Sequence, residues 1–137
     1  MPRQLSLLVK GVDHANRKPK TRGRIPRRFE IAASLPGEPV DLVPEPDNPA
    51  DPNAIMIFSA RGIQLGYVAA ERAPYIGGHI RRGEDVRAIF QEATRHGAII
   101  RVSLDGSEPV LPERSAQETS PPSEDEGYFV DPVWPDD

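Results

Sequence analysis

Apolar residues fall into short runs along the chain, and most of these runs have the length of a β-strand. Residues 54–58 are apolar throughout, as in a strand buried on both faces, whereas apolar and polar side chains alternate in residues 29–34, as in a half-buried strand. Turn-forming pairs such as Pro36-Gly37 separate neighbouring runs. We therefore predict six or seven short strands, at residues 5–9, 29–34, 40–43, 54–58, 63–68, 86–93 and 99–104.

Residues 69–82 carry the one helical pattern, because alanines and isoleucines recur there at helical spacing and Gly83 stands where a helix would end. Pro74 and the Gly77-Gly78 pair weaken this pattern. The strands lie too close together in sequence for parallel crossovers, which need about a dozen residues or more. The pattern thus predicts a mainly β fold, a small antiparallel barrel of about six strands with one or two short helices.

The charged residues are grouped in blocks along the chain, so the net charge alone does not describe the folded part. The 137 residues include 17 Lys and Arg and 21 Asp and Glu, for a net charge of -4, which taken alone disfavours a polyanionic ligand. Residues 1–28, however, hold nine basic residues and one acid, and residues 102–137 hold ten acids and one Arg. Residues 1–101 together carry a net charge of +5, so binding to a nucleic acid stays open.

These blocks suggest one folded domain, residues 1–112, with a basic loop at about 10–28, followed by an acidic tail at 113–137. The tail is rich in acids and prolines, a composition typical of disordered chains. Its aromatic residues are Tyr128, Phe129 and Trp134. Besides an inert linker, two interpretations remain: the aromatic residues bind a protein partner as a short motif, or they lie in a basic groove of the same chain and mimic a nucleic-acid strand.

The residue inventory excludes several classes of function. There is no Cys, so disulfide scaffolds, thiol nucleophiles and thiolate zinc sites are ruled out. The histidines show no metal-ligand spacing, and neither a nucleophile with its base nor a phosphate-binding glycine loop is present, so we expect no enzyme activity, metal or cofactor. No stretch approaches the ~20 apolar residues of a membrane span, and the start lacks the apolar core of a signal peptide, so we expect a cytoplasmic protein without a membrane partner.

Residues 44–53 form a loop of unusual composition. Four of these ten residues are proline, which stiffens the chain and excludes a helix or an inner strand. Among the prolines stand four residues that form local hydrogen bonds, Asp47, Asn48, Asp51 and Asn53. Such a loop is either a structural knot, in which these side chains bind nearby main-chain amides, or a rigid ligand site.

The sequence in and after this loop resembles a known family. Residues 42–55 read LVPEPDNPADPNAI and residues 63–68 read IQLGYV. Both motifs, in this order, resemble the HIRAN domain, and the similarity extends over roughly residues 5–104. The resemblance implies an OB-like barrel that binds single-stranded DNA, in particular a free 3′-hydroxyl end, in DNA repair or replication. It also implies a stand-alone module, without the helicase of larger relatives such as the helicase-like transcription factor.

The resemblance assigns roles to residues of the proline-rich loop. Asp47 and Asn48 would border the terminal nucleotide of the strand, and Asp51 would lie near its 3′-hydroxyl group. Pro49 and Asn53 would keep the loop in shape. The loop is therefore expected to be both stiff and in contact with DNA.

Other expected DNA contacts lie outside this loop. Tyr67 stands where relatives use His or Tyr to touch DNA, although it could equally be a barrel residue with its hydroxyl at the rim. His14 could stack on a base. Basic side chains of the first loop would follow the phosphate backbone. They are Arg17, Lys18, Lys20 and Arg22.

Two residues depart from the family pattern. Ala50 lacks the aromatic ring that DNA-binding relatives carry there, and stacking on such a ring is worth ~1–3 kcal/mol per base. Asp13 stands approximately where relatives have an Arg, and its charge would repel phosphate. A second interpretation therefore stays open, that of a protein-interaction adaptor which keeps the barrel and has a degenerate DNA site.

Overall fold

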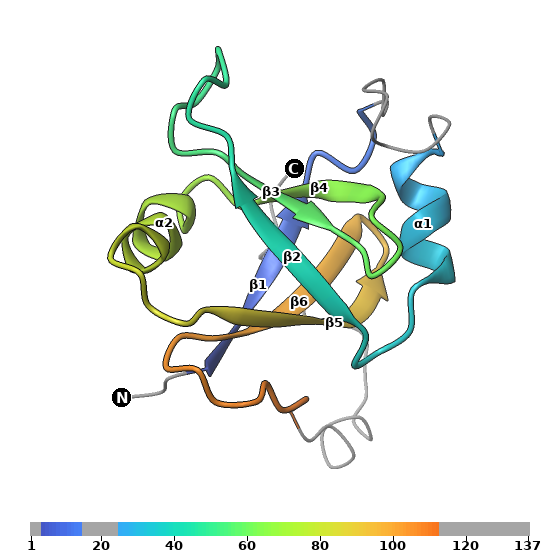
Figure 1. The fold of residues 1–137 in the computed structure, drawn as a ribbon. Coiled ribbons are helices and arrows are strands. Elements are labelled where there is room, and N and C mark those ends of the chain that lie inside the picture. Colours follow the sequence, from blue (N-terminus) through green and yellow to red (C-terminus); the bar gives the residue numbers. More distant parts are fainter. Residues whose placement is uncertain (1–3, 15–24, 113–137) are drawn as a thin grey trace.

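The computed structural model describes residues 4–14 and 25–112. Over these residues the chain forms a closed barrel of six antiparallel strands with two helices (Figure 1). The elements in chain order are β1 (Gln4–Lys10), α1 (Arg27–Ala33), β2 (Pro39–Pro44), β3 (Ile55–Phe58), β4 (Gln64–Val68), α2 (Ala73–Arg81), β5 (Arg87–Thr94) and β6 (Gly97–Ser103). Around the barrel the order is β1-β4-β3-β2-β5-β6, and β1 closes it by pairing with both β4 and β6.

The barrel interior is filled by apolar side chains from alternate positions of the strands. In β6, Ala98, Ile100 and Val102 have no exposed surface, whereas the residues between them are partly exposed. Phe90 of β5 and Leu65 of β4 belong to the same core cluster. The predicted mainly β, antiparallel barrel is confirmed, and six of the predicted strands are present within two residues of their expected ends.

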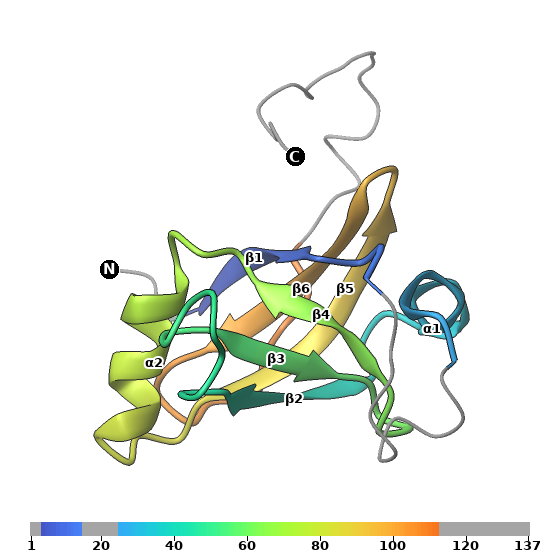
Figure 2. The same ribbon diagram turned by 90° about the horizontal axis from the view of Figure 1, so that it is seen from above.

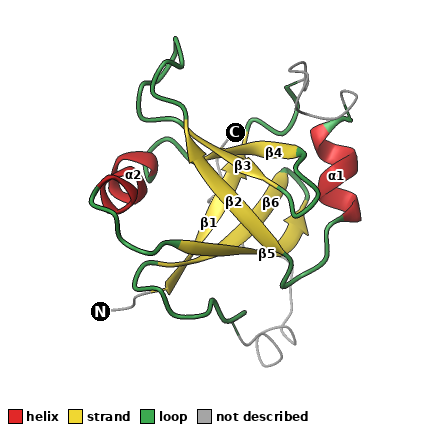
Figure 3. Ribbon diagram, viewed as in Figure 1, coloured by secondary structure: helices red, strands yellow, loops and turns green. Residues whose placement is uncertain are grey.

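The prediction of a strand at residues 29–34 is wrong, because this segment lies in α1 (Figure 3). Phe29 is 64% exposed, whereas Arg27, Glu30 and Ile31 are buried. Spacings of three and four residues place the buried side chains on one face of a helix. Pro26 directly precedes the helix, a place where its fixed φ and missing N–H are compatible with helix formation. Tertiary packing of three residues thus overrides the alternation of apolar and polar side chains.

The predicted helix at residues 69–82 is present as the shorter α2, which begins at Ala73. Pro74 lies in its first turn, where an N–H has no acceptor within the helix. Gly83 follows the helix with a φ of 80°, and its N–H donates to the carbonyl of Ile80 at 2.9 Å, the usual arrangement of a glycine after a helix. Of the residues that weakened the prediction, Pro74 thus stands in the first turn, whereas Gly77 and Gly78 lie within the helix.

Two helices cover opposite sides of the barrel, α1 beside the β3–β4 turn and α2 across from it (Figures 1 and 2). The β2–β3 loop lies on the α2 side of the barrel, and residues 11–14 after β1 lie on the α1 side (Figures 1 and 2). Neither helix in the described ranges has the length and apolar character needed to cross a membrane. The acidic tail at 113–137 and the basic residues Arg17, Lys18, Lys20 and Arg22 lie outside the described residues.

Candidate nucleic-acid interface

The proline-rich loop between β2 and β3 is organised around Asn48. The Asn48 Oδ1 atom accepts hydrogen bonds from the main-chain N–H groups of Ala50, at 2.8 Å, and Asp51, at 3.0 Å. Its Nδ2 atom donates to Glu45 Oε1 at 2.9 Å. At the base of the loop, Glu45 N donates to Ala54 O at 2.9 Å. Asn48 therefore forms the structural knot that the composition of the loop suggested.

Asp51 occupies the next turn of the same loop. Its Oδ1 atom accepts from the main-chain N–H of Asn53 at 2.9 Å, and its carbonyl accepts from Ala54 N at 3.0 Å. An ionised carboxylate has about four lone-pair sites, so one bond to Oδ1 leaves acceptor capacity for a ligand. Asp47 and Pro49 are exposed at the surface of the loop. Asn53 contributes to the loop through its main-chain N–H, and the residue is exposed.

Tyr67 connects β4 to this loop. Its hydroxyl donates to Glu45 Oε1 at 2.7 Å, the same oxygen that accepts from Asn48. Burial, and then the hydrogen bond to Glu45, raise the pKa of the Tyr67 phenol. The residue remains partly exposed, so a ligand can still contact it while its hydroxyl is bonded to Glu45.

A buried arginine holds the other side of the Tyr67 ring. Arg27 is only 6% exposed, and its Nη1 atom donates to the carbonyl of Gly11 at 2.7 Å. Its guanidinium carbon lies 5.7 Å from the centre of the Tyr67 ring, within the range of a cation–π contact. Burial lowers the pKa of Arg27, while Tyr67 and Glu45 act in the opposite direction. The sequence placed Arg27 in the basic segment but gave no sign of this buried position.

His14 lies close to Tyr67 across Gly11. A Cβ atom added to Gly11 would lie 3.6 Å from both His14 Cδ2 and Tyr67 Cδ1. The N–H of His14 donates to the carbonyl of Gly11 at 3.2 Å, which forms the turn after β1. Two side chains predicted to contact bases are thereby brought together, although 53 residues separate them in the chain.

Asp13 has a different environment from the one expected. Its carboxylate forms an ion pair with Arg28 of α1, and the hydrogen bond from Arg28 lowers the pKa of Asp13. Because a cation neutralises it, Asp13 is not the isolated negative charge that would repel phosphate. Within the described part of the chain, no group of three or more His, Asp or Glu side chains is placed to hold a metal ion.

Replacing Asn48 by alanine is expected to lower the free energy of unfolding by about 1–2 kcal/mol, because two loop amides would lose their acceptor. The urea midpoint measures this loss. Amide hydrogen exchange at Ala50 and Asp51 should become faster than in the unaltered chain. The neighbouring substitution Asp47→Ala is the control, since this exposed side chain should leave both measurements nearly unchanged.

The titration of Tyr67 should depend on Glu45. Because the folded-state pKa of Tyr67 lies above its unfolded value of about 10, its contribution to stability is complete below about pH 10 and is lost as the pH rises through the folded pKa. Glu45→Gln should shift the titration of Tyr67, followed by NMR of its ring carbons, to lower pH. An unchanged midpoint in this variant would contradict a contribution from the Glu45 carboxylate.

Comparisons with known proteins identify one family. A family model described as HIRAN domain matches residues 23–105, which is more than half of the chain. The crystal structure of the HIRAN domain of human HLTF is similar to this chain with a TM-score of 0.55 and 18% identity, over 73% of each chain. A crystal structure of a protein from Lactobacillus plantarum also has a TM-score of 0.55, with 17% identity over 72% of this chain and 91% of that one. No curated protein sequence matches this chain.

Proposed function

The chain belongs to the HIRAN domain family, and from this premise we propose that it is a non-enzymatic module that binds single-stranded DNA at a free 3′-hydroxyl end. The observation that carries the proposal is the fixed position of Asp51 on the knotted β2–β3 loop. A rigid carboxylate can accept a hydrogen bond from a terminal hydroxyl without first losing conformational entropy. A 3′-phosphate at the same place would bring two negative groups together.

Neighbouring side chains offer contacts for the bases and the phosphates of a single strand. His14 and Tyr67 lie on either side of Gly11 and offer rings on which bases can stack. The Arg27 guanidinium lies over the Tyr67 ring and places a positive charge beside it. Basic residues of the first loop, Arg17, Lys18, Lys20 and Arg22, would contact the phosphate backbone. Recognition of strand ends fits a role in DNA repair or replication.

A titration followed by fluorescence anisotropy tests the proposal with two strands that differ only in a 3′-hydroxyl or a 3′-phosphate. The full chain should bind the hydroxyl strand about tenfold more tightly, a difference of about 1.4 kcal/mol. In Asp51→Ala this preference should disappear, whereas Asp47→Ala should keep it. Equal affinity of the unaltered chain for both strands would exclude end recognition. Repeating the titration at several salt concentrations counts the phosphate contacts.

One observation favours a second function, that of a protein-interaction adaptor on the same barrel. Ala50 offers no ring to a terminal base, and the Tyr67 hydroxyl and both polar atoms of the Asn48 side chain are already bonded within the protein. These interactions stabilise the loop whether or not DNA is present. Failure to bind any strand at low salt, together with co-purification of a protein partner through the acidic tail, would select this function.

A further inference from the structure

One strand of the barrel has a partly open edge. β1 pairs with β6 from Gln4 to Val9, but it pairs with β4 only at Val9 and Lys10. The last contact on the β4 side is the hydrogen bond from Ala69 N to Leu8 O, at 3.2 Å. Main-chain groups of alternate residues point to the same side of a strand, so the N–H and C=O of Ser6 point to the side left open by β4.

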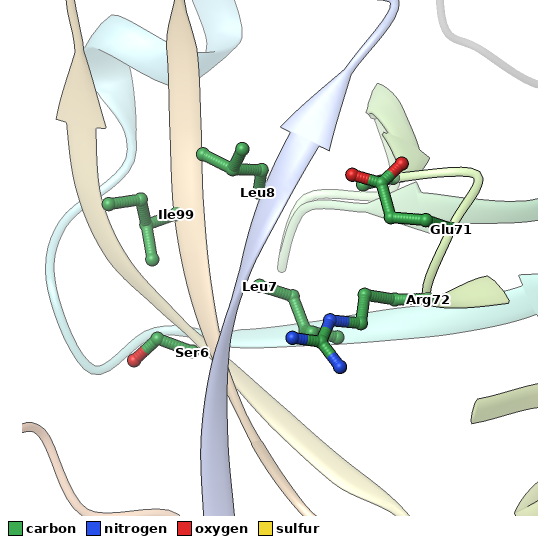
Figure 4. Close-up of a pocket in the computed structure, with 7 residues that line it drawn as sticks. Ser6, Leu7, Leu8, Glu71, Arg72 and Ile99 are labelled. Atoms are coloured by element: carbon green, nitrogen blue, oxygen red, sulfur yellow. The ribbon is translucent and has the colours of Figure 1, made fainter. Parts of the chain in front are cut away.

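A hollow of about 420 Å³ lies beside this open edge. Its walls are Ser6, Leu8 and Ile99 on the barrel and Ala69, Glu71 and Arg72 on the connection from β4 to α2 (Figure 4). The Arg72 side chain extends toward β1 near Leu7 (Figure 4). The hollow therefore combines apolar side chains with main-chain groups that have no partner among the described residues, which are features of a site for an added strand. Its lining includes one anion, Glu71, and one cation, Arg72, and the cation extends toward β1.

An exposed aromatic side chain stands in the first turn of α2, next in the chain to the residues that line the hollow. Tyr75 follows Arg72 by three residues, so the two side chains lie on the same helix face. Tyr75 is 53% exposed, and its ring packs edge-to-face on His79 with centroids 4.8 Å apart. An exposed tyrosine beside an exposed arginine suits a segment that is both aromatic and acidic.

The chain itself contains such a segment beyond the described residues. Residues 113–137 include eight acids and one Arg, and within them Tyr128, Phe129 and Val130 are consecutive residues of high strand propensity. Three acids stand just before this group, at positions 124–126, and Pro132 follows it, where a strand would have to end. The pattern is that of a strand of about five residues, 127–131, directly preceded by three acidic residues.

The chain leaves the barrel close to the open edge. Val110 N donates to Gln4 Oε1 at 2.8 Å, and Gln4 Nε2 donates to the carbonyl of Glu108 at 3.0 Å. Residues 108–110 are thus bound to the first residue of β1, two positions before Ser6. Fifteen residues lie between Pro112 and Tyr128, and they can span up to about 50 Å when extended. This reach exceeds the size of a barrel of about 100 residues.

We propose that residues 127–131 of the chain's own acidic terminus add as a strand to the open edge of β1. The main chain of the segment bonds the N–H and C=O of Ser6, its aromatic side chains contact Leu8 and Tyr75, and the acids at 124–126 face Arg72. The hollow shares no residue with the loop around Asn48, so the proposal can be tested without DNA.

Amide hydrogen exchange of Ser6 in the full chain tests the proposal. Phe129→Pro removes a donor from the added strand and Arg72→Glu reverses the charge that faces the acids, so each should accelerate exchange of the Ser6 amide at least tenfold. Thr119→Pro, outside the segment, and Arg81→Glu, at the other end of α2, are the matched controls and should leave it unchanged. An unaltered urea midpoint in all four variants shows that the barrel is intact.

Two outcomes would overturn the proposal. Equal exchange of the Ser6 amide in the unaltered chain and in Phe129→Pro would mean that the terminus does not occupy the edge. Protection of Ser6 that increases with protein concentration would assign the added strand to a second copy of the chain instead. Protection that is independent of concentration and lost in both test variants supports addition within one chain.

Discussion

Replacing Gly66 by alanine is expected to lower the free energy of unfolding by about 3 kcal/mol or more, because no side chain fits at this position of β4. A Cβ atom there would lie 2.3 Å from the carbonyl oxygen of Lys10 and 2.9 Å from Val9 Cγ1. The oxygen belongs to the main chain of β1 and cannot rotate away. Since β1 pairs with β4 only at Val9 and Lys10, any displacement of β1 opens the barrel at one of its two shortest pairings, the other being that of β2 with β5.

Urea denaturation followed by circular dichroism measures this loss. Gly78→Ala is the matched control, because Gly78 lies in α2 and the nearest atom to its added Cβ would be the flexible Arg82 Nη1, at 3.5 Å. Alanine is favoured over glycine in a helix by up to ~1 kcal/mol, so the control should be as stable as the unaltered chain or more so. A Gly66→Ala variant that unfolds at the unaltered midpoint would contradict the close approach of β1 and β4.

The strands were predictable because their signals are local. Residues 54–58 are continuously apolar, and all four residues of β3 are buried. Prolines and glycines mark the turns, so the hairpin from β3 to β4 follows from the sequence alone. Pairing of β2 with β3, β3 with β4 and β5 with β6 fits short connections between antiparallel neighbours. The pairs β1–β4, β2–β5 and β1–β6 join strands that are not neighbours in the chain, so the complete strand order could not be predicted. The partial pairing of β1 with β4 could not be predicted, because it depends on where the chain turns away toward α2.

α1 shows where a local pattern is insufficient. Alternation in residues 29–34 fits a strand, yet the segment is helical because Arg27, Glu30 and Ile31 find buried partners on the barrel. A buried arginine and a buried glutamate are polar residues that sequence patterns assign to the surface. Only knowledge of Arg61 and Gly11, distant in the chain, explains their burial.

The loop of the candidate site could be predicted from the sequence, but the residues that position Tyr67 could not. The Asx and proline composition of residues 44–53 correctly indicated a knotted loop, and Asn48 and Asp51 are the side chains that hold it. Glu45 and Arg27, which position Tyr67, were not singled out because their partners lie 22 and 40 residues away. A charged residue beside a turn is a weak signal until its contacts are known.

The ion pair between Arg61 and Glu30 predicts the second large effect. Arg61 Nε donates to Glu30 Oε2 at 2.6 Å, and the Glu30 side chain is only 3% exposed. Arg61→Ala would leave this carboxylate buried without its cation, a change that costs about 3–5 kcal/mol at fully buried sites. The Arg61 side chain is 42% exposed, so solvent screens part of the interaction, and we expect a loss of about 2–3 kcal/mol.

A double-mutant cycle separates the charge from the packing. Glu30→Gln combined with Arg61→Ala removes the unpaired charge, so the double variant should recover about half of the stability lost in Arg61→Ala. Arg87→Ala is the control, because Arg87 and Asp85 form an exposed pair and its loss should leave the urea midpoint unchanged. Simple additivity of the two single changes would mean that Arg61 and Glu30 do not interact.

Arg61→Ala should also change the candidate DNA site. Arg61 fastens α1 to the β3–β4 turn, and the first residue of α1 is Arg27, which holds the Gly11 carbonyl and the Tyr67 ring. Displacement of α1 therefore removes the contacts that hold the side chains expected to stack on bases. Asp51, on the β2–β3 loop, keeps its own hydrogen bonds. Arg61→Ala should weaken binding of both 3′-hydroxyl and 3′-phosphate strands, by about tenfold for one stacked base lost. The preference between the two strands should persist, because it depends on Asp51.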